Sequence, residues 1–323
     1  MEKIWREIEA ILQQARQETE HFLENNPDGT IIIRGATATG KSKLSVLLSE
    51  FFDTEIISAD SRQIFRTMDI GTDKVSQEIR NKIPHHQIDI ISPDETYTAG
   101  QRKDDSENAM EKILSKKKVP IIVGGTGLYI DTIYKNFSMP ECPPDYPFRE
   151  KMQQQEDNQP GFLYQELMKI DPEEAQKLHP NSSRYLIRAL EIFHSTGRTK
   201  TENFLQQSVK HPLLMIGLRR ETEETNRRIN ARIKEMIKGW LLEEVQNLLD
   251  QGHSPDLQSM QGIGYKEVVE FLQGKIDQEK MEENLKRNTH HLAKKQRTRF
   301  RRYIAEGKQT PRENVTYKTR FLD

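Results

Sequence analysis

Short apolar runs alternate with helical segments through the first third of the chain. Each run is bounded by polar or turn-forming residues, and its length suits a buried strand. Residues 109–114 have helical spacing and precede one of these runs. Strands that alternate with helices predict an α/β fold, in which helices cover both faces of a parallel sheet. The predicted strands are 31–33, 55–58, 87–91, 119–123 and, much later in the chain, 211–218.

The regions on either side of these strands have helical spacing. Apolar positions in 2–24 recur with a helical period and predict an amphipathic helix that packs on the body of the domain. A proline-rich boundary at 140–147 leads into segments without a strand signal. We expect a helical insertion there, in which 182–194 is either its best helix or its return to the core.

Beyond Arg219 every segment reads as helix, at 225–249, 264–272 and 281–304. We therefore expect four parts along the chain. They are an N-terminal helix, the first part of the core, a helical insertion, and a return strand followed by a helical C-terminal region. In residue numbers these parts are 1–28, 29–139, 140–207 and 208–323.

The composition is that of a water-exposed protein with a modest core. Of 323 residues, 34% are hydrophobic and 31% are charged, and the net charge is −1. The apolar runs are shorter than a membrane span, and the N-terminal segment lacks a signal-peptide core and is too acidic for a mitochondrial transit peptide. Cys142 is the only cysteine, which excludes a disulfide framework and a cysteine-based zinc site. We expect a cytoplasmic protein with no membrane partner.

The segment after the first predicted strand fits the pattern G-x-x-x-x-G-K-[ST]. In this pattern a glycine-rich turn directs backbone N–H groups at phosphate oxygens, and the lysine adds a positive charge. The Ser/Thr hydroxyl reaches Mg²⁺, and the helix that follows directs its positive end at the anion. A di- or triphosphate site is therefore predicted, with Ser42 as the metal ligand. Its residues are Gly35, Ala36, Thr37, Ala38, Thr39, Gly40, Lys41 and Ser42.

Polar residues also follow two of the other predicted strands. Asp60 lies just past 55–58, and Thr126 belongs to the Gly-Gly-Thr-Gly segment after 119–123. Residues past the carboxyl ends of parallel strands line the ligand crevice of such folds. Asp60 could therefore bind Mg²⁺ or accept a proton as a general base, while a purely structural role as a helix N-cap stays open. The glycines before Thr126 allow a close backbone approach to a ligand.

A basic run occupies the last predicted helix. Residues 284–305 contain eight Lys or Arg and no Asp or Glu. A solvated helix face usually carries acids among its bases, so their absence favours a phosphate-binding surface over a plain solvated face. The basic residues are Lys286, Arg287, Lys294, Lys295, Arg297, Arg299, Arg301 and Arg302.

Together these motifs resemble those of one family, the tRNA dimethylallyltransferases, also called isopentenyl-diphosphate:tRNA transferases. The resemblance covers about residues 30–303 and rests on the order and spacing of many short segments. It implies a P-loop NTPase-like parallel sheet flanked by helices, with a helical insertion and a helical C-terminal region. The segments are 35–42, Ser-Ala-Asp-Ser at 58–61, Met-Asp-Ile-Gly-Thr at 68–72, 84–89, 124–129, Arg-Ala-Leu-Glu at 188–191, 228–232, Ile-Gly-Tyr-Lys-Glu at 263–267 and Leu-Ala-Lys-Lys-Gln at 292–296.

The resemblance implies the transfer of a dimethylallyl group from its diphosphate to the exocyclic N6 of the adenosine just 3′ of the anticodon in tRNA. By similarity, Asp60 takes the proton of the attacking amine. Thr126, Lys41 and Ser42 with Mg²⁺ would stabilise the departing pyrophosphate. Arg228 or Arg232 would close over the diphosphate, so that Asp60, Thr126 and Arg228 are the implied catalytic residues and Arg232 binds the diphosphate.

The resemblance also implies how tRNA is bound. The basic helix would track the backbone of the anticodon stem, and the insertion at 140–207 would contact the anticodon loop. The target base would be flipped out of its stack to reach Asp60. The residues implied in tRNA binding are Ser61, Gln63, Asp69, Thr72, Lys294, Lys295, Gln296 and Arg297.

The chain departs from the family pattern at several positions. It has Gly-Ala-Thr at 35–37 where Gly-Pro-Thr is usual, and His290 and Arg299 stand where a Thr-Arg pair and an aromatic are common. Its single cysteine cannot build the zinc-finger extension of eukaryotic members. We therefore expect a bacterial type. We also expect a monomer.

Three other interpretations compete with this one. An adenylate isopentenyltransferase would use the same chemistry on a free nucleotide, but a mononucleotide needs neither the basic helices nor the insertion. A P-loop kinase for a small molecule would turn over ATP, and no lid arginines are evident beyond those already placed. A non-catalytic RNA-binding protein is disfavoured because Lys41, Asp60 and Thr126 are intact.

Overall fold

The computed structural model describes residues 2–137, 139, 142–204, 208–309 and 315–322. The chain divides into two compact units. The first comprises Met1–Tyr97, Arg102–Tyr134 and Val209–Asp323, and the second comprises Thr98–Gln101 and Lys135–Ser208. Within the described residues, no helix is both long and apolar enough to cross a membrane.

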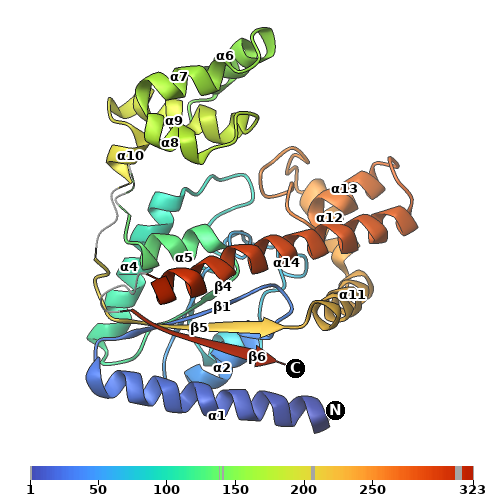
Figure 1. The fold of residues 1–323 in the computed structure, drawn as a ribbon. Helices are drawn as coiled ribbons and strands as arrows, with labels where there is room; N and C mark the ends of the chain where they lie inside the picture. The colour runs from blue at the N-terminus through green and yellow to red at the C-terminus, as the bar shows by residue number, and fades with distance from the viewer. Residues whose placement is uncertain (1, 138, 140–141, 205–207, 310–314, 323) are drawn as a thin grey trace. The chain divides into compact units, whose positions relative to one another are not determined.

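A parallel sheet forms the centre of the first unit (Figure 1). It has six strands in the order β3-β2-β4-β1-β5-β6 among the described residues, and every strand pair is parallel. The predicted parallel α/β sheet is therefore confirmed. The strands are β1 (Thr30–Gly35), β2 (Ile56–Ser58), β3 (His85–His86), β4 (Ile121–Gly124), β5 (Leu213–Arg220) and β6 (Val315–Leu322).

Helices cover both faces of this sheet, with α1 and α2 on one side and α4, α5 and α14 on the other (Figure 1). The N-terminal helix packs on the domain body, as predicted, because Phe22 is buried together with Ile31 and Leu48. The helices of this unit are α1 (Glu2–Asn25), α2 (Lys41–Phe51), α3 (Gln77–Lys82), α4 (Ala99–Ser115, from Arg102 on), α5 (Gly127–Tyr134), α11 (Thr222–Lys238), α12 (Leu241–Asp250), α13 (Tyr265–Leu272) and α14 (Gln278–Gln309).

Strand β1 shows why the sheet is fully covered. Ile31 and Ile33 point into the cluster formed with α1 and α2, whereas Ile32 points into the cluster formed with α4 and α5. All three side chains are 0% exposed. A strand buried on both faces needs apolar residues at every position, and each isoleucine contributes about 1.5–3 kcal/mol on burial.

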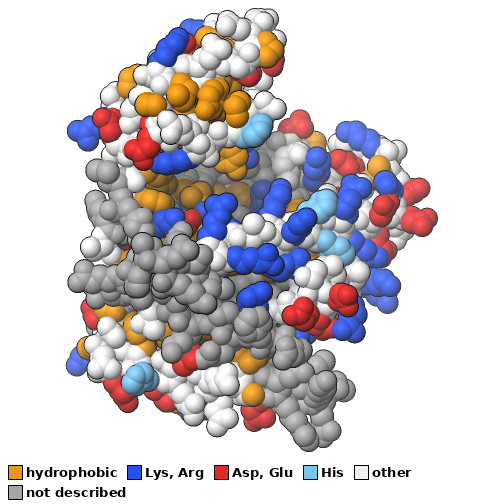
Figure 2. Space-filling model, in the orientation of Figure 1, with side chains coloured by type: hydrophobic (Ala, Val, Ile, Leu, Met, Phe, Trp, Pro, Cys, Tyr) orange, Lys and Arg blue, Asp and Glu red, His pale blue; other side chains and the backbone are white. Residues whose placement is uncertain are grey.

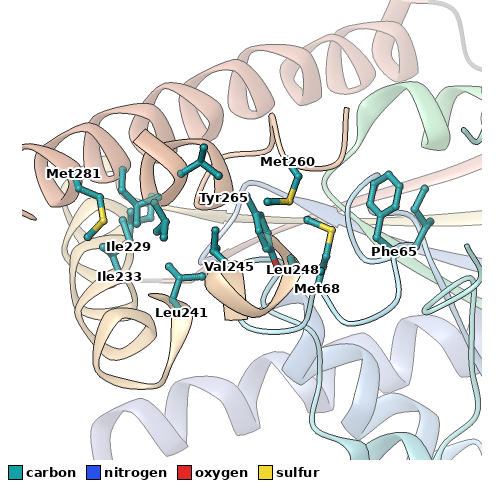
Figure 3. Close-up of a cluster of buried hydrophobic side chains, with 14 of the residues drawn as sticks. Phe65, Met68, Ile229, Ile233, Leu241, Val245, Leu248, Met260, Tyr265 and Met281 are labelled. Carbon is teal, nitrogen blue, oxygen red and sulfur yellow. The ribbon is translucent and has the colours of Figure 1, made fainter. Parts of the chain in front are cut away.

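A separate apolar cluster lies under α11, α12, α13 and the start of α14 (Figure 3). Tyr265 is 1% exposed and packs with Val245 and Met260 from the helical region. Met68, from the chain segment after β2, belongs to the same cluster. This packing fixes the segment around Met68 against the C-terminal helices.

The second unit is helical in its described residues, in agreement with the predicted helical character of 140–207. Its core includes Leu163, Leu167 and Leu186. The buried Glu191 carboxylate pairs with Arg149 and Arg188. The helices are α6 (Tyr146–Asn158), α7 (Phe162–Ile170), α8 (Pro172–Lys177), α9 (Ser183–Thr196) and α10 (Lys200–Asn203). Parts of the predicted insertion, 140–141 and 205–207, lie outside the described residues.

Two local predictions are wrong. The strand predicted at 87–91 is replaced by the shorter β3, because Gln87 and Asp89 have positive φ angles of 64° and 57°. The long helix predicted at 225–249 is broken into α11 and α12 at Gly239 and Trp240, where Trp240 has a φ of 76°. Neither break is marked by a proline, and side-chain patterns do not report φ.

The prediction that everything beyond Arg219 is helical is also wrong. Strand β6 pairs with β5 in parallel, with Val315 opposite Leu213. Its sequence, Val-Thr-Tyr-Lys-Thr-Arg-Phe-Leu, is rich in β-branched and aromatic residues, a strand signal that lies beyond the last predicted helix at 281–304 and was missed. Residues 310–314, within the predicted C-terminal region, lie outside the described part of the chain.

Candidate active site

A cavity of about 1370 Å³ opens at the carboxyl ends of β1, β2 and β4 in the first unit. This is the edge where parallel α/β sheets bind ligands, because the loops leaving neighbouring strands converge there. The structure brings together in its wall the main candidates that the sequence suggested. These are Thr37, Lys41, Asp60, Thr126, Arg228 and Arg232.

The predicted phosphate loop, residues 35–42, runs from the end of β1 to the start of α2. Gly35 must be glycine, because a Cβ there would lie 2.7 Å from the carbonyl oxygen of Leu218. Gly40 has a φ of 96°, which also favours glycine. The Thr39 hydroxyl donates to the carbonyl oxygen of Ala36 at 2.8 Å and closes the turn. Gly35, Ala36 and Thr39 therefore shape the loop, while Thr37, Ala38, Gly40, Lys41 and Ser42 line the cavity.

Three cations lie around this loop. The Lys41 Nζ donates to the carbonyl oxygen of Ala36 at 2.7 Å, and the Arg228 Nε donates to the carbonyl oxygen of Ala38 at 3.2 Å. Arg232 lies one helical turn after Arg228 on α11, and its Nη2 donates to the Thr37 hydroxyl at 2.8 Å. Each of these cations donates a hydrogen bond to an oxygen atom of the loop.

Burial lowers the pKa of Lys41 to about 8, while the negative charge of Asp60 acts in the opposite direction. The positive charge of Arg232 adds to the lowering. A bound diphosphate would favour the protonated amine, because opposite charges in close contact stabilise each other.

Asp60 follows β2 and lies at the edge of the cavity. Its Oδ1 accepts from the backbone N–H of Arg62 at 2.8 Å, which closes a turn. The helix that follows, α3, has Ser76 as its N-cap, so the alternative of Asp60 as a helix N-cap is wrong. A half-buried carboxylate in the cavity wall can accept a proton from a ligand.

The loops that follow β2 and β4 are tied to each other. The Thr126 Oγ1 accepts from the backbone N–H of Ser61 at 3.1 Å, and the Thr126 backbone N–H donates to the Ala59 carbonyl at 3.2 Å. Gly124 allows this contact, because a Cβ there would lie 2.1 Å from the Ala59 carbonyl oxygen. Thr126 is therefore held at a fixed place next to Asp60.

Gln296 connects two of the cavity loops through α14. Its Oε1 accepts from the backbone N–H of Thr37 at 2.8 Å, and its Nε2 donates to the Gly125 carbonyl at 3.1 Å. The sequence suggested a contact of Gln296 with tRNA, and the structure places it against the phosphate loop. No local signal could have shown this, because the partner lies 259 positions away in the chain.

The other residues implied in tRNA binding differ in their surroundings. Ser61, Gln63 and Thr72 line the cavity. The Gln63 amide is engaged, since it accepts from the Ser58 hydroxyl at 2.9 Å and donates to the Thr72 carbonyl at 3.3 Å. Asp69 is ion-paired with Lys74.

Glu244 is a residue that the sequence analysis missed. Its carboxylate accepts from the backbone N–H groups of Asp69 and Ile70 at 2.8 Å and from that of Gly71 at 3.1 Å. The Tyr265 hydroxyl donates to the same carboxylate at 2.6 Å. Residues 69–71 are thus held by Glu244 of α12, which is itself oriented by Tyr265 of α13.

The basic residues of α14 fall into two groups. Lys294 and Lys295 are exposed and line the cavity. Arg297 is half-buried, and its Nη1 has no hydrogen-bond partner among the described residues. Figure 2 shows Lys and Arg side chains gathered on the face over α14 and the helices beside it. Such a face suits a polyanion.

The two departures from the family pattern on α14 make contacts within the protein. The His290 Nε2 lies 2.9 Å from the Asn230 Oδ1 on α11, and burial lowers the pKa of His290. Arg299 is ion-paired with Asp131 on α5. Both residues therefore join α14 to neighbouring helices.

Residues 63–303 match the family described as IPP transferase. A tRNA dimethylallyltransferase of Pelotomaculum thermopropionicum is 46% identical over 283 residues, covering 87% of this chain and 90% of the relative. One of Thermotoga petrophila is 44% identical over 294 residues, covering 90% of this chain and 93% of the relative.

Solved structures are similar as well. A tRNA isopentenylpyrophosphate transferase of Bacillus halodurans has a TM-score of 0.64 and 36% identity, covering 91% of this chain and 90% of its own. A eukaryotic dimethylallyltransferase described as acting on tRNA has a TM-score of 0.73 and 28% identity, covering 90% of this chain and 73% of its own. The resemblance seen in the sequence is confirmed.

Proposed function

The chain belongs to the IPP transferase family, and we propose that its cavity moves a dimethylallyl group from dimethylallyl diphosphate to tRNA. The acceptor atom is the exocyclic N6 of the adenosine 3′ of the anticodon. In the reaction a bond forms between this nitrogen and C1 of the dimethylallyl group. The bond from C1 to the diphosphate oxygen breaks, and its electron pair leaves with pyrophosphate.

The observation that carries the proposal is the convergence of the phosphate loop, Asp60 and Thr126 in one cavity. An aromatic exocyclic amine is a weak nucleophile, so placement and stabilisation of the leaving group must supply most of the lowering of the barrier. A site that combines a carboxylate with three cations meets both needs. Val123, Met236 and Ile263 line the same cavity and offer apolar surface to the dimethylallyl group.

The diphosphate is held by the backbone N–H groups of the phosphate loop together with Lys41, Arg228 and Arg232. These groups offset the charge that grows on the leaving pyrophosphate. Asp60 binds the N6 amine and takes its proton as the new bond forms. Thr126 is held beside Asp60 by its bond to Ser61 and provides a further polar contact with the diphosphate.

Mg²⁺ would be held by the Ser42 hydroxyl and the diphosphate oxygens, where it would neutralise charge on the phosphates. Among the described residues, no group of three or more His, Cys, Asp and Glu could hold a metal by itself. Ser42 lines the cavity next to Lys41, and Mg²⁺ is commonly bound through substrate phosphates and water with few protein ligands.

The tRNA is bound through its backbone and its loop. Lys294, Lys295 and Arg297 contact the phosphates of the anticodon stem, and the segment 69–72 with Ser61 and Gln63 faces the target nucleoside. The helical unit contacts the anticodon loop, where the exposed Tyr146 and Tyr185 can stack on bases. We propose that the enzyme acts as a monomer in the cytoplasm, where its tRNA substrate is found.

The test is an incubation with Mg²⁺ and labelled dimethylallyl diphosphate. Unmodified tRNA with adenosine 3′ of the anticodon is compared with the same tRNA carrying guanosine at that position, and with AMP and ATP. Label should appear only in the adenosine-containing tRNA. Label on AMP alone would indicate an adenylate isopentenyltransferase, and ATP consumption without transfer would indicate a kinase.

A further inference from the structure

The cavity wall beside the phosphate loop carries an acid, Asp73, that the proposed chemistry does not use. Its carboxylate is ion-paired with Nη1 of Arg232, and the two side chains are 52% and 23% exposed. The negative charge of Asp73 also acts on Lys41, where it opposes the lowering of the pKa by burial. An acid at this place opposes the binding of a diphosphate, because like charges repel.

Asp73 is presented by a segment with little freedom. Its backbone N–H donates to the Ile70 carbonyl at 3.1 Å, and its own carbonyl accepts from the Gln63 Nε2 at 3.3 Å. Glu244 holds the preceding residues through three backbone N–H groups. These bonds hold the backbone of Asp73, whose φ of 54° is unusual for a residue other than glycine, and the ion pair with Arg232 orients its carboxylate.

Arg232 stands between this acid and the phosphate loop. Its Nη1 contacts Asp73, while its Nη2 donates to the Thr37 hydroxyl at 2.8 Å. A diphosphate on the loop would approach the same guanidinium. The diphosphate would then bind Arg232 together with Asp73, or would replace Asp73 as the partner of Arg232.

The other two cations differ from Arg232 in this respect. Lys41 and Arg228 are held by carbonyl oxygens of the loop, which are neutral. Arg232 is held by a full negative charge. Hydrogen bonds to a charged partner are stronger than those to a neutral one, so Arg232 is the cation with the strongest competing acceptor.

We propose that Asp73 is an internal counter-ion that pairs with Arg232 and competes with diphosphates for it, which weakens their binding. The ion pair between Asp73 and Arg232 forms again as the product leaves, and this favours the release of pyrophosphate. This inference rests on the proposed function, since it requires a diphosphate on the phosphate loop. It gives Asp73 a role in the affinity for donor and product, without a contact to the reacting atoms.

The experiment is a calorimetric titration of the full-length protein with inorganic pyrophosphate and Mg²⁺. Asp73→Asn keeps the shape of the side chain and removes its charge. It should bind pyrophosphate about tenfold more tightly than the wild type, because one nearby negative charge is gone. Asp73→Glu keeps the charge and should bind as the wild type does. Asp256→Asn, which removes an exposed acid between α12 and α13, is the matched control and should change nothing.

Two further readouts separate competition from a general structural effect. Pyrophosphate should inhibit the transfer reaction more strongly in Asp73→Asn than in the wild type. The difference in affinity should shrink as the ionic strength rises, because salt screens the charge of this half-exposed carboxylate. Circular dichroism on heating establishes that each variant is folded.

The outcomes are distinct. Unchanged or weaker pyrophosphate binding by folded Asp73→Asn overturns the inference, and weaker binding would mean that Asp73 orients Arg232. If the wild type binds pyrophosphate while Asp73→Asn does not differ from it, the proposed function stands and only the counter-ion role fails. If the wild type binds no pyrophosphate, both fail together.

Discussion

The cavity loops after β1, β2 and β4 and the basic face of α14 border the same cavity, but they are built differently. In the loops, polar groups bond to one another, as Thr126 does with Ser61 and Gln63 with Ser58. On α14, Lys294 and Lys295 extend their side chains into solvent. The cavity loops are held in a single geometry, whereas the lysine side chains of α14 can change conformation.

This difference separates two tasks. Groups fixed before the reaction lower the barrier, because no further ordering is needed when charge develops. Exposed lysines contribute to binding by releasing counterions from the nucleic acid, which requires charge but no fixed geometry. Changes in the loops should therefore act on the rate, and changes on α14 should act on tRNA affinity.

The largest effect is expected at Asp60. Asp60→Asn keeps the size of the side chain but removes the proton acceptor, so the single-turnover rate should fall by roughly 10²- to 10⁴-fold. The affinity for tRNA should change less than about threefold, because phosphate contacts supply most of it. A rate close to that of the wild type, or a loss of tRNA binding instead of rate, would mean that the two regions are not divided in this way.

A smaller effect is expected on α14. In the double variant Lys294→Ala/Lys295→Ala, tRNA affinity should fall on the order of 30-fold, and the slope of log K against log salt should decrease by about 1.5. The rate at saturating tRNA should stay near that of the wild type. Lys112→Ala, at an exposed position on α4, serves as the control. An unchanged salt slope in the double variant would remove these lysines from the tRNA surface.

The smallest effect concerns the pH dependence of the donor site. Burial lowers the pKa of Lys41 to about 8, so its amine is mostly protonated at pH 7 and mostly neutral at pH 9. Only the protonated amine attracts the diphosphate, so the affinity for dimethylallyl diphosphate should fall about tenfold between these pH values. Lys41→Arg keeps its charge in this range and should show a flatter profile. A flat profile in the wild type would argue against Lys41 as a titrating contact.

The comparison also shows what could be read from local sequence. The place of the loop at 35–42 between a strand and a helix was predictable, because its glycines and lysine lie within a few residues of one another. Asp60 and Thr126 were predictable from their place after apolar strands, since parallel strands deliver their carboxyl ends to one edge. The basic face of α14 was visible as a run of charge without acids.

Other features required the tertiary structure. Strand β6 depends on pairing with β5, and the path of the chain at 87–91 depends on the positive φ angles of Gln87 and Asp89. Gln296 bonds to Thr37 and Gly125, and Glu244 bonds to the backbone of 69–71. In each case the partners lie more than 100 positions apart in the chain.

Residue type and spacing within short segments were enough to predict the parallel α/β core and the family, and they led to the prediction of a phosphate-binding loop at 35–42. The acceptor that each cation contacts, and the pairing of Asp73 with Arg232, became known from the folded structure. The reason is physical. The sequence shows which side chains are charged, but packing between distant segments determines which partner each one contacts. The energy of an ion pair depends on the distance between the two charges and on their burial.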